Sequence, residues 1–138
     1  MRISTKGRYA VRLLLDIAVY DEVEPVRLKD TAERQNISMK YLEQIISVLV
    51  RAGFVKSIRG PQGGYRLVKE PKDYTVGMIL RQGEGSLEDD VNRCERQAGC
   101  VSLRIWKELD EAINSVVDKY TLQDLIDWQE ELGCDYVI

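Results

Sequence analysis

The stretch between residues 27 and 67 constrains the fold of this chain more than any other. Its apolar residues change there from the spacing of a helix to short runs on either side of a glycine-rich segment. Its apolar side chains first recur every three or four residues, the stripe of an amphipathic helix: Leu42, Ile45, Ile46, Leu49 and Val50. Ser38 stands at the N-cap position of this helix, and Gly53 follows its last periodic residue as a stop signal. We therefore expect a helix between these two residues.

The segments around this helix complete a recognisable order. A short helix is expected from Leu28 to Gln35, with Asn36 as a left-handed turn residue. Strands are expected over residues 54–58 and 65–68, on either side of the glycine-rich tip 59–64. Helix, turn, helix, strand, tip and strand predict a winged helix-turn-helix. The outer face of the second helix carries long polar side chains, which suit a DNA major groove (Lys40, Glu43, Gln44, Ser47 and Arg51).

The rest of the chain is expected to be mostly helical. A first helix should run from residue 4 or 5 to 20 and bury one stripe: Ala10, Leu13, Leu14, Ile17 and Ala18. Thr75 should cap a fourth helix that ends near Gln82. The expected organisation is a DNA-binding domain over 1–82, a cysteine-containing sensor loop over 83–100, and a long dimerisation helix with a C-terminal helix over 101–138. The fold class is mostly α with a small β-wing.

The helix expected over residues 101–119 carries an apolar seam with heptad spacing. Its members are Trp106, Leu109, Ile113, Val116 and Tyr120. We interpret this seam as a homodimer interface; the alternative is a helix that packs on its own domain. Thr121 and Asp124 form a capping-box pattern for the last helix. We expect apolar residues of that helix to dock against the long helix: Leu122, Leu125, Ile126 and Trp128.

The charge of the chain is divided unevenly along its length. The net charge is −3, but residues 1–72 hold 14 Lys and Arg against 8 Asp and Glu, or +6, whereas residues 73–138 hold 6 against 15, or −9. Basic residues on the predicted reading head would attract phosphates, and the acidic half would face away. Random segregation on a solvated surface is the alternative.

Several classes of function are disfavoured by the sequence. The chain has no histidine, which removes Ser-His-Asp and Cys-His catalysis, and it has no Walker, dinucleotide-binding or nucleophile-elbow motif. We therefore expect no enzyme activity. No apolar run approaches the roughly 20 residues of a membrane span. The expected location is the cytoplasm.

Three segments resemble the Rrf-two family of bacterial regulators: MRISTKGRYAV, SMKYLEQIISVLVRAGFVKSIRGPQGGYRL and RIWKELDEAINSVVDKYTLQDL. The resemblance implies a dimeric repressor with crossed long helices that binds a palindromic operator in double-stranded DNA. Glu43 and Gln44 would then reach base edges, and Arg59 in the wing would enter the minor groove. The residues implied to hold phosphate or adjacent base atoms are Ser38, Lys40 and Tyr41. For Tyr41, ordinary helix packing is the alternative.

The resemblance also implies a sensor in the loop, usually a [2Fe–2S] cluster on three cysteines and a fourth ligand such as histidine. Here Cys94 and Cys100 match two of those cysteines, whereas Leu103 stands where the histidine would be. Asp89, Cys134 or the partner subunit would have to complete the ligand set. A thiol-redox switch and the absence of any sensing role are the alternatives. The regulated genes would serve iron–sulfur or cysteine metabolism, and a cysteine-biosynthesis enzyme is an implied partner for the acidic half.

Overall fold

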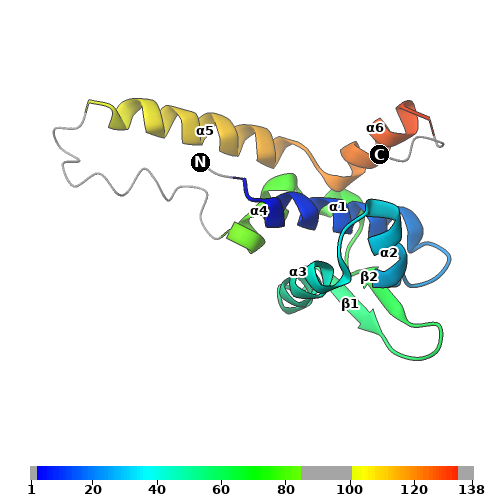
Figure 1. Cartoon of the computed structure of the whole chain (residues 1–138). Coiled ribbons are helices and arrows are strands. Elements are labelled where there is room, and N and C mark those ends of the chain that lie inside the picture. The colour runs from blue at the N-terminus through cyan, green and yellow to red at the C-terminus, as the bar shows by residue number, and fades with distance from the viewer. Residues whose placement is uncertain (1–2, 85–100, 134–138) are drawn as a thin grey trace.

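The computed structural model describes residues 3–84 and 101–133, and over these ranges it contains six α-helices, one 3-10 helix (η1) and a two-stranded antiparallel sheet (Figure 1). Their order along the chain is α1 (Thr5–Tyr20), α2 (Leu28–Gln35), α3 (Met39–Arg51), β1 (Val55–Ile58), β2 (Gly64–Leu67), η1 (Pro71–Asp73), α4 (Val76–Glu84), α5 (Leu103–Lys119) and α6 (Leu122–Glu131). The predicted winged helix-turn-helix order is confirmed.

The helix ends follow the local signals in the sequence. The Ser38 hydroxyl accepts a hydrogen bond from the Tyr41 N–H at 3.2 Å, and the Thr75 hydroxyl accepts one from the Met78 N–H at 3.1 Å. Asn36 adopts the left-handed conformation, with φ of 54°, at the turn between α2 and α3. Thr121 begins α6 with the predicted capping box. These caps confirm the predicted starts of α3, α4 and α6.

The wing is a short hairpin that a third segment extends. β1 pairs with β2 so that Val55 lies opposite Leu67, and each strand differs from its predicted range by one residue at one or both ends. Val26, just before α2, exchanges two backbone hydrogen bonds with Tyr65, at 2.9 and 2.8 Å. A Cβ atom on Gly64 would lie 2.5 Å from the Val26 carbonyl oxygen, so glycine permits this close approach. This pairing was not predicted from the sequence.

The main core lies around α1, which packs against α2, α3, α4, α6 and β2. The side chains that are most completely buried come from most of the elements: Leu13, Leu14, Ile17, Leu42, Ile45, Leu49, Val55, Tyr74, Ile79 and Leu122. Leu122 shows that the C-terminal segment contributes to the same core as the winged helix.

Two predictions about packing were wrong. Val50 is exposed, because at 100° per residue it lies roughly 90° from the centre of the buried stripe of α3, at its edge. The last helix, α6, packs on α1 and η1 rather than along α5. Its Leu122 enters the main core with Leu125 beside it, whereas Trp128 is 44% exposed and its ring meets that of Tyr120, the C-cap residue of α5. Leu122 is held there by the shared core, which α5 does not reach with any residue of the main cluster.

The long helix α5 lies on the opposite side of α1 from α3 and the wing (Figure 1). Its C-terminal half packs on α4, where Val117 and Ile113 contact Leu80. At the other end, Leu103 in the first turn is also buried. Arg81 of α4 adds an ion pair to Asp118, with Nη1–Oδ1 at 2.6 Å. α5 begins two residues later than predicted and ends where expected. None of the helices in the described ranges is long and apolar enough to cross a membrane.

Candidate DNA-binding surface

The outer face of α3 is a continuous exposed polar surface. Its exposed members are those that the sequence predicted: Lys40, Glu43, Gln44, Ser47 and Arg51. The opposite side of the helix fills the core through Leu42, Ile45, Ile46 and Leu49. This division fixes which face of α3 is presented outward, because a rotation of the helix would bury charge and expose four apolar side chains. The face is therefore free to contact a ligand.

Ser38 and Tyr41, at the start of α3, both have structural partners. The Ser38 oxygen is the N-cap acceptor, which leaves its hydroxyl hydrogen available for another partner. The Tyr41 ring is half-buried and meets the Tyr9 ring edge-on, with centroids 5.3 Å apart and an interplanar angle of 83°. Arg12 lies over the other ring of this pair, 5.4 Å from the Tyr9 centroid. Tyr41 thus has the packing role that was its alternative interpretation.

The wing presents Arg59 at its exposed tip. Gly60 has φ of 115°, a conformation that other residues rarely adopt, and the Gly63 N–H donates to the Gly60 carbonyl at 2.9 Å. The tip is therefore a tight, hydrogen-bonded turn. Arg59 forms no ion pair with any residue in the described ranges. Its guanidinium is available for a phosphate or a groove.

A buried polar network that was not predicted from the sequence holds α2 against α1. The Asp16 carboxylate, 2% exposed, accepts hydrogen bonds from the Thr31 hydroxyl at 2.6 Å, from Arg34 Nε and Nη2 at 2.9 and 2.8 Å, and from the Gln35 side chain at 3.3 Å. The hydrogen bond to Asp16 raises the pKa of Arg34, whose guanidinium also covers the Tyr20 ring at 4.0 Å. The signal that could have revealed it was an acid in the middle of the apolar run LLLDIAV.

The predicted seam of α5 is divided between two environments. Trp106, Leu109 and Val116 are 49%, 48% and 55% exposed, although all three are large apolar side chains. Ile113 is half-buried against α4, and the Tyr120 ring lies 5.1 Å from that of Trp128 in α6. Three of the five predicted seam residues therefore face outward, and two pack within the chain.

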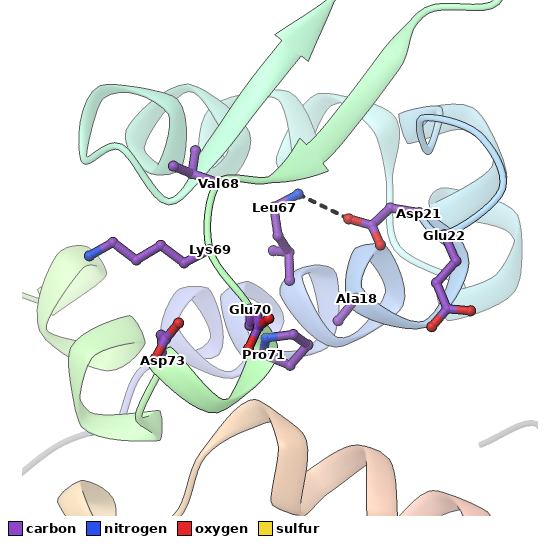
Figure 2. A pocket seen from close by; sticks show the side chains of 9 residues that line it. All are labelled: Ala18, Asp21, Glu22, Leu67, Val68, Lys69, Glu70, Pro71 and Asp73. Atoms are coloured by element: carbon purple, nitrogen blue, oxygen red, sulfur yellow. Dashed lines mark hydrogen bonds between the residues drawn. The ribbon is translucent and has the colours of Figure 1, made fainter.

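A groove at the end of α1 is unsuited to DNA. It encloses about 480 Å³ between the end of α1, the end of β2 and η1 (Figure 2). Its charged lining is mainly acidic, with Asp21, Glu22, Glu70 and Asp73 against one lysine, Lys69. One of these carboxylates, that of Asp21, already accepts a hydrogen bond from the Leu67 N–H at 3.1 Å. Carboxylates repel phosphates, so the polar face of α3 and the wing are the better candidates.

The cysteines predicted to form the sensor, Cys94 and Cys100, lie outside the described residues, as does Cys134. Within the described residues there is no group of three cysteines, histidines or carboxylates that could hold a metal ion. The whole chain has three cysteines and no histidine, whereas a [2Fe–2S] cluster needs four ligands, usually cysteine or histidine. The residues of one chain thus do not supply the usual ligand set.

Comparison with known proteins identifies the family. Residues 3–128 match the Rrf-two (Rrf2) family model, described as an iron-dependent transcriptional regulator. The HTH-type transcriptional regulator IscR of Serratia proteamaculans (strain 568) is 39% identical over 138 residues, which cover 96% of this chain and 83% of the relative.

Two solved structures resemble the fold closely. IscR from T. potens has a TM-score of 0.83 and 42% identity, covering 99% of this chain and 93% of that one. CymR, the global cysteine regulator of B. subtilis, has a TM-score of 0.81 and 38% identity, covering 93% of this chain and 98% of that one. These relatives are named as regulators, which agrees with the lack of catalytic motifs in the sequence of this chain. The chain belongs to the Rrf-two family of transcriptional regulators.

Proposed function

We propose that this chain acts in the cytoplasm as a homodimeric repressor that binds a palindromic operator through α3 and the wing. The observation that carries the proposal is the outer face of α3, where exposed polar side chains lie opposite a fully buried apolar stripe. Recognition helices of this kind place their N-terminal residues against base edges in the major groove. Family membership supports the DNA-binding role.

Each proposed contact follows from the chemistry of the side chain. Gln44 suits bidentate hydrogen bonding to adenine, and Glu43 can accept from the amino group of cytosine. Lys40, exposed one turn earlier, would neutralise a phosphate. Ser38 and Tyr41 would contact neighbouring phosphate or base atoms of the DNA. Arg59 at the wing tip would enter a narrow A/T-rich minor groove, where the electrostatic potential attracts a guanidinium.

The dimer is proposed to form along α5. Trp106, Leu109 and Val116 leave an apolar strip on this helix, and Ile105 beside them is 57% exposed. Exposed apolar side chains gathered on one helix are expected to be covered by a partner. Because α5 lies opposite α3, a second copy here would leave both recognition helices free to reach the half-sites (Figure 1).

For the signal, we propose that the Cys94 and Cys100 thiols control DNA affinity, with genes of iron–sulfur or cysteine metabolism as targets. The description of the family as iron-dependent favours a [2Fe–2S] cluster with ligands added from elsewhere, such as Asp89, Cys134 or the partner subunit. The incomplete ligand set and the likeness to a cysteine regulator favour the alternative, a cluster-free chain controlled by thiol oxidation or by a cysteine-biosynthesis enzyme.

The DNA proposal is tested by separating base reading from phosphate contact. Gln44→Ala should lower the affinity for the operator by about 1–3 kcal/mol and relax base preference at one position. Lys40→Ala should instead weaken binding to all duplexes and flatten the dependence of log affinity on log salt. Glu33→Ala on α2, an exposed residue outside the proposed surface, is the control. Equal loss of specific and random binding in Gln44→Ala would remove this residue from the reading set.

The sensor proposal is tested by anaerobic purification with an absorption spectrum and iron and sulfide analysis. A cluster should give coloured protein that Cys94→Ala and Cys100→Ala each bleach. Without a cluster, colourless protein should change its DNA affinity with peroxide and recover with a thiol reductant. If the double replacement responds to iron, oxidant and reductant as the wild type does, the signal enters elsewhere.

A further inference from the structure

We infer that Arg27 is a positioning residue for the wing, acting through the Pro61 carbonyl to hold Arg59 in place for the minor groove. This inference rests on the proposed function. Arg27 occupies the N-cap of α2, where its side chain makes no capping hydrogen bond. Its guanidinium Nη2 donates to the Pro61 carbonyl oxygen at 2.6 Å instead. A residue at the start of α2 therefore reaches across to the tip of the wing.

The base and the tip of the wing are held in different ways. At the base, the backbone of Val26 pairs with that of Tyr65, as described above. Beyond this pair, residues 59–62 are all exposed and each strand is four residues long. A two-stranded hairpin of this length is only marginally stable by itself. Within the described part of the chain, no side-chain hydrogen bond other than that of Arg27 joins residues 59–63 to a helix.

The position of Pro61 explains why this bond would matter for DNA. Arg59 lies two residues before Pro61, on the other side of Gly60, whose φ of 115° is a conformation that other residues rarely adopt. Fixing the Pro61 carbonyl restricts the conformations open to the tip before DNA arrives, and less ordering entropy then opposes binding. Loss of one such hydrogen bond should weaken operator binding about threefold to tenfold. It should also reduce the preference for A·T pairs under the wing.

The test compares Arg27→Met with Lys29→Met. Both replacements remove one exposed positive charge at the start of α2, but Lys29 makes no hydrogen bond to the wing. The probe is a duplex that the wild-type protein recovers from a random-sequence library, together with versions in which successive A·T pairs are replaced by G·C. The wing position is the one at which Arg59→Ala loses its A·T preference.

Arg27→Met should lose that A·T preference, and Lys29→Met should keep it. In the Arg59→Ala background, Arg27→Met should lower operator affinity no more than Lys29→Met does. The reason is that the effect of Arg27 beyond its charge requires the Arg59 side chain. In the free protein, amide hydrogen exchange at Gly63 should be faster in Arg27→Met than in Lys29→Met. This last readout does not depend on DNA.

Two results would overturn the inference while leaving the proposed function intact. One is an Arg27→Met protein that retains the A·T preference and loses no more affinity than Lys29→Met. The other is full additivity with Arg59→Ala, which would make Arg27 an independent phosphate contact. If wild-type protein recovers no duplex, the proposed function fails and the inference fails with it.

Discussion

Replacing Asp16 by alanine should destabilise the fold strongly, although the residue touches no proposed ligand. The change leaves the Thr31 hydroxyl, in a residue that is 0% exposed, without its acceptor, which costs about 1–3 kcal/mol. It also removes the bidentate partner of Arg34, whose side chain is 30% exposed, so water compensates part of that loss. A total of about 3–4 kcal/mol agrees with the range for breaking a buried ion pair. Asp16→Asn keeps an acceptor for Thr31 and should cost about half as much.

The assay is urea unfolding followed by helical circular dichroism, at one protein concentration for all variants because dimerisation contributes to apparent stability. Asp30→Ala is the matched control, since Asp30 is an exposed carboxylate in the first turn of α2. Its replacement should lower the free energy of unfolding by about 0.3–1 kcal/mol. If Asp16→Ala loses less than about 1 kcal/mol, or no more than the control, the network does not hold α2 on α1.

Tyr74→Phe should cost about 1–3 kcal/mol in urea unfolding, because the buried hydroxyl donates to the Phe54 carbonyl at 2.7 Å; an unchanged midpoint would contradict this. Leu109→Asp should give monomers by analytical ultracentrifugation with normal helical content, since Leu109 is exposed in the single chain, and a persistent dimer would place the interface elsewhere. Arg81 lowers the pKa of the Asp118 carboxyl, so the pair stabilises the fold above about pH 4 and this contribution is lost as the pH falls through the lower folded-state pKa. The stability difference between wild type and Asp118→Asn should accordingly shrink on acidification, and a difference that grows would refute this assignment.

The sequence alone determined the elements whose signals are local. The bounds of α1 and α2, the Ser38 cap and the left-handed Asn36 all agree with the structure. Each depends on residues within about one helical turn, namely a capping hydroxyl, the apolar period or a tolerated positive φ. The outer face of α3 was predictable for the same reason, since the buried stripe of an amphipathic helix defines its exposed side.

Only the tertiary structure decided which elements meet. Asp16 is buried because Thr31 and Arg34, fifteen and eighteen residues away, supply its hydrogen bonds. The packing of α6 on α1 and the pairing of Val26 with Tyr65 likewise join segments far apart in the chain. Local periodicity shows that a helix has an apolar face but not what covers it, since burial depends on the combined shape of all the elements. For that reason α5 displays its apolar seam in both sequence and structure, yet only the structure shows that Ile113 and Tyr120 are already occupied within the chain.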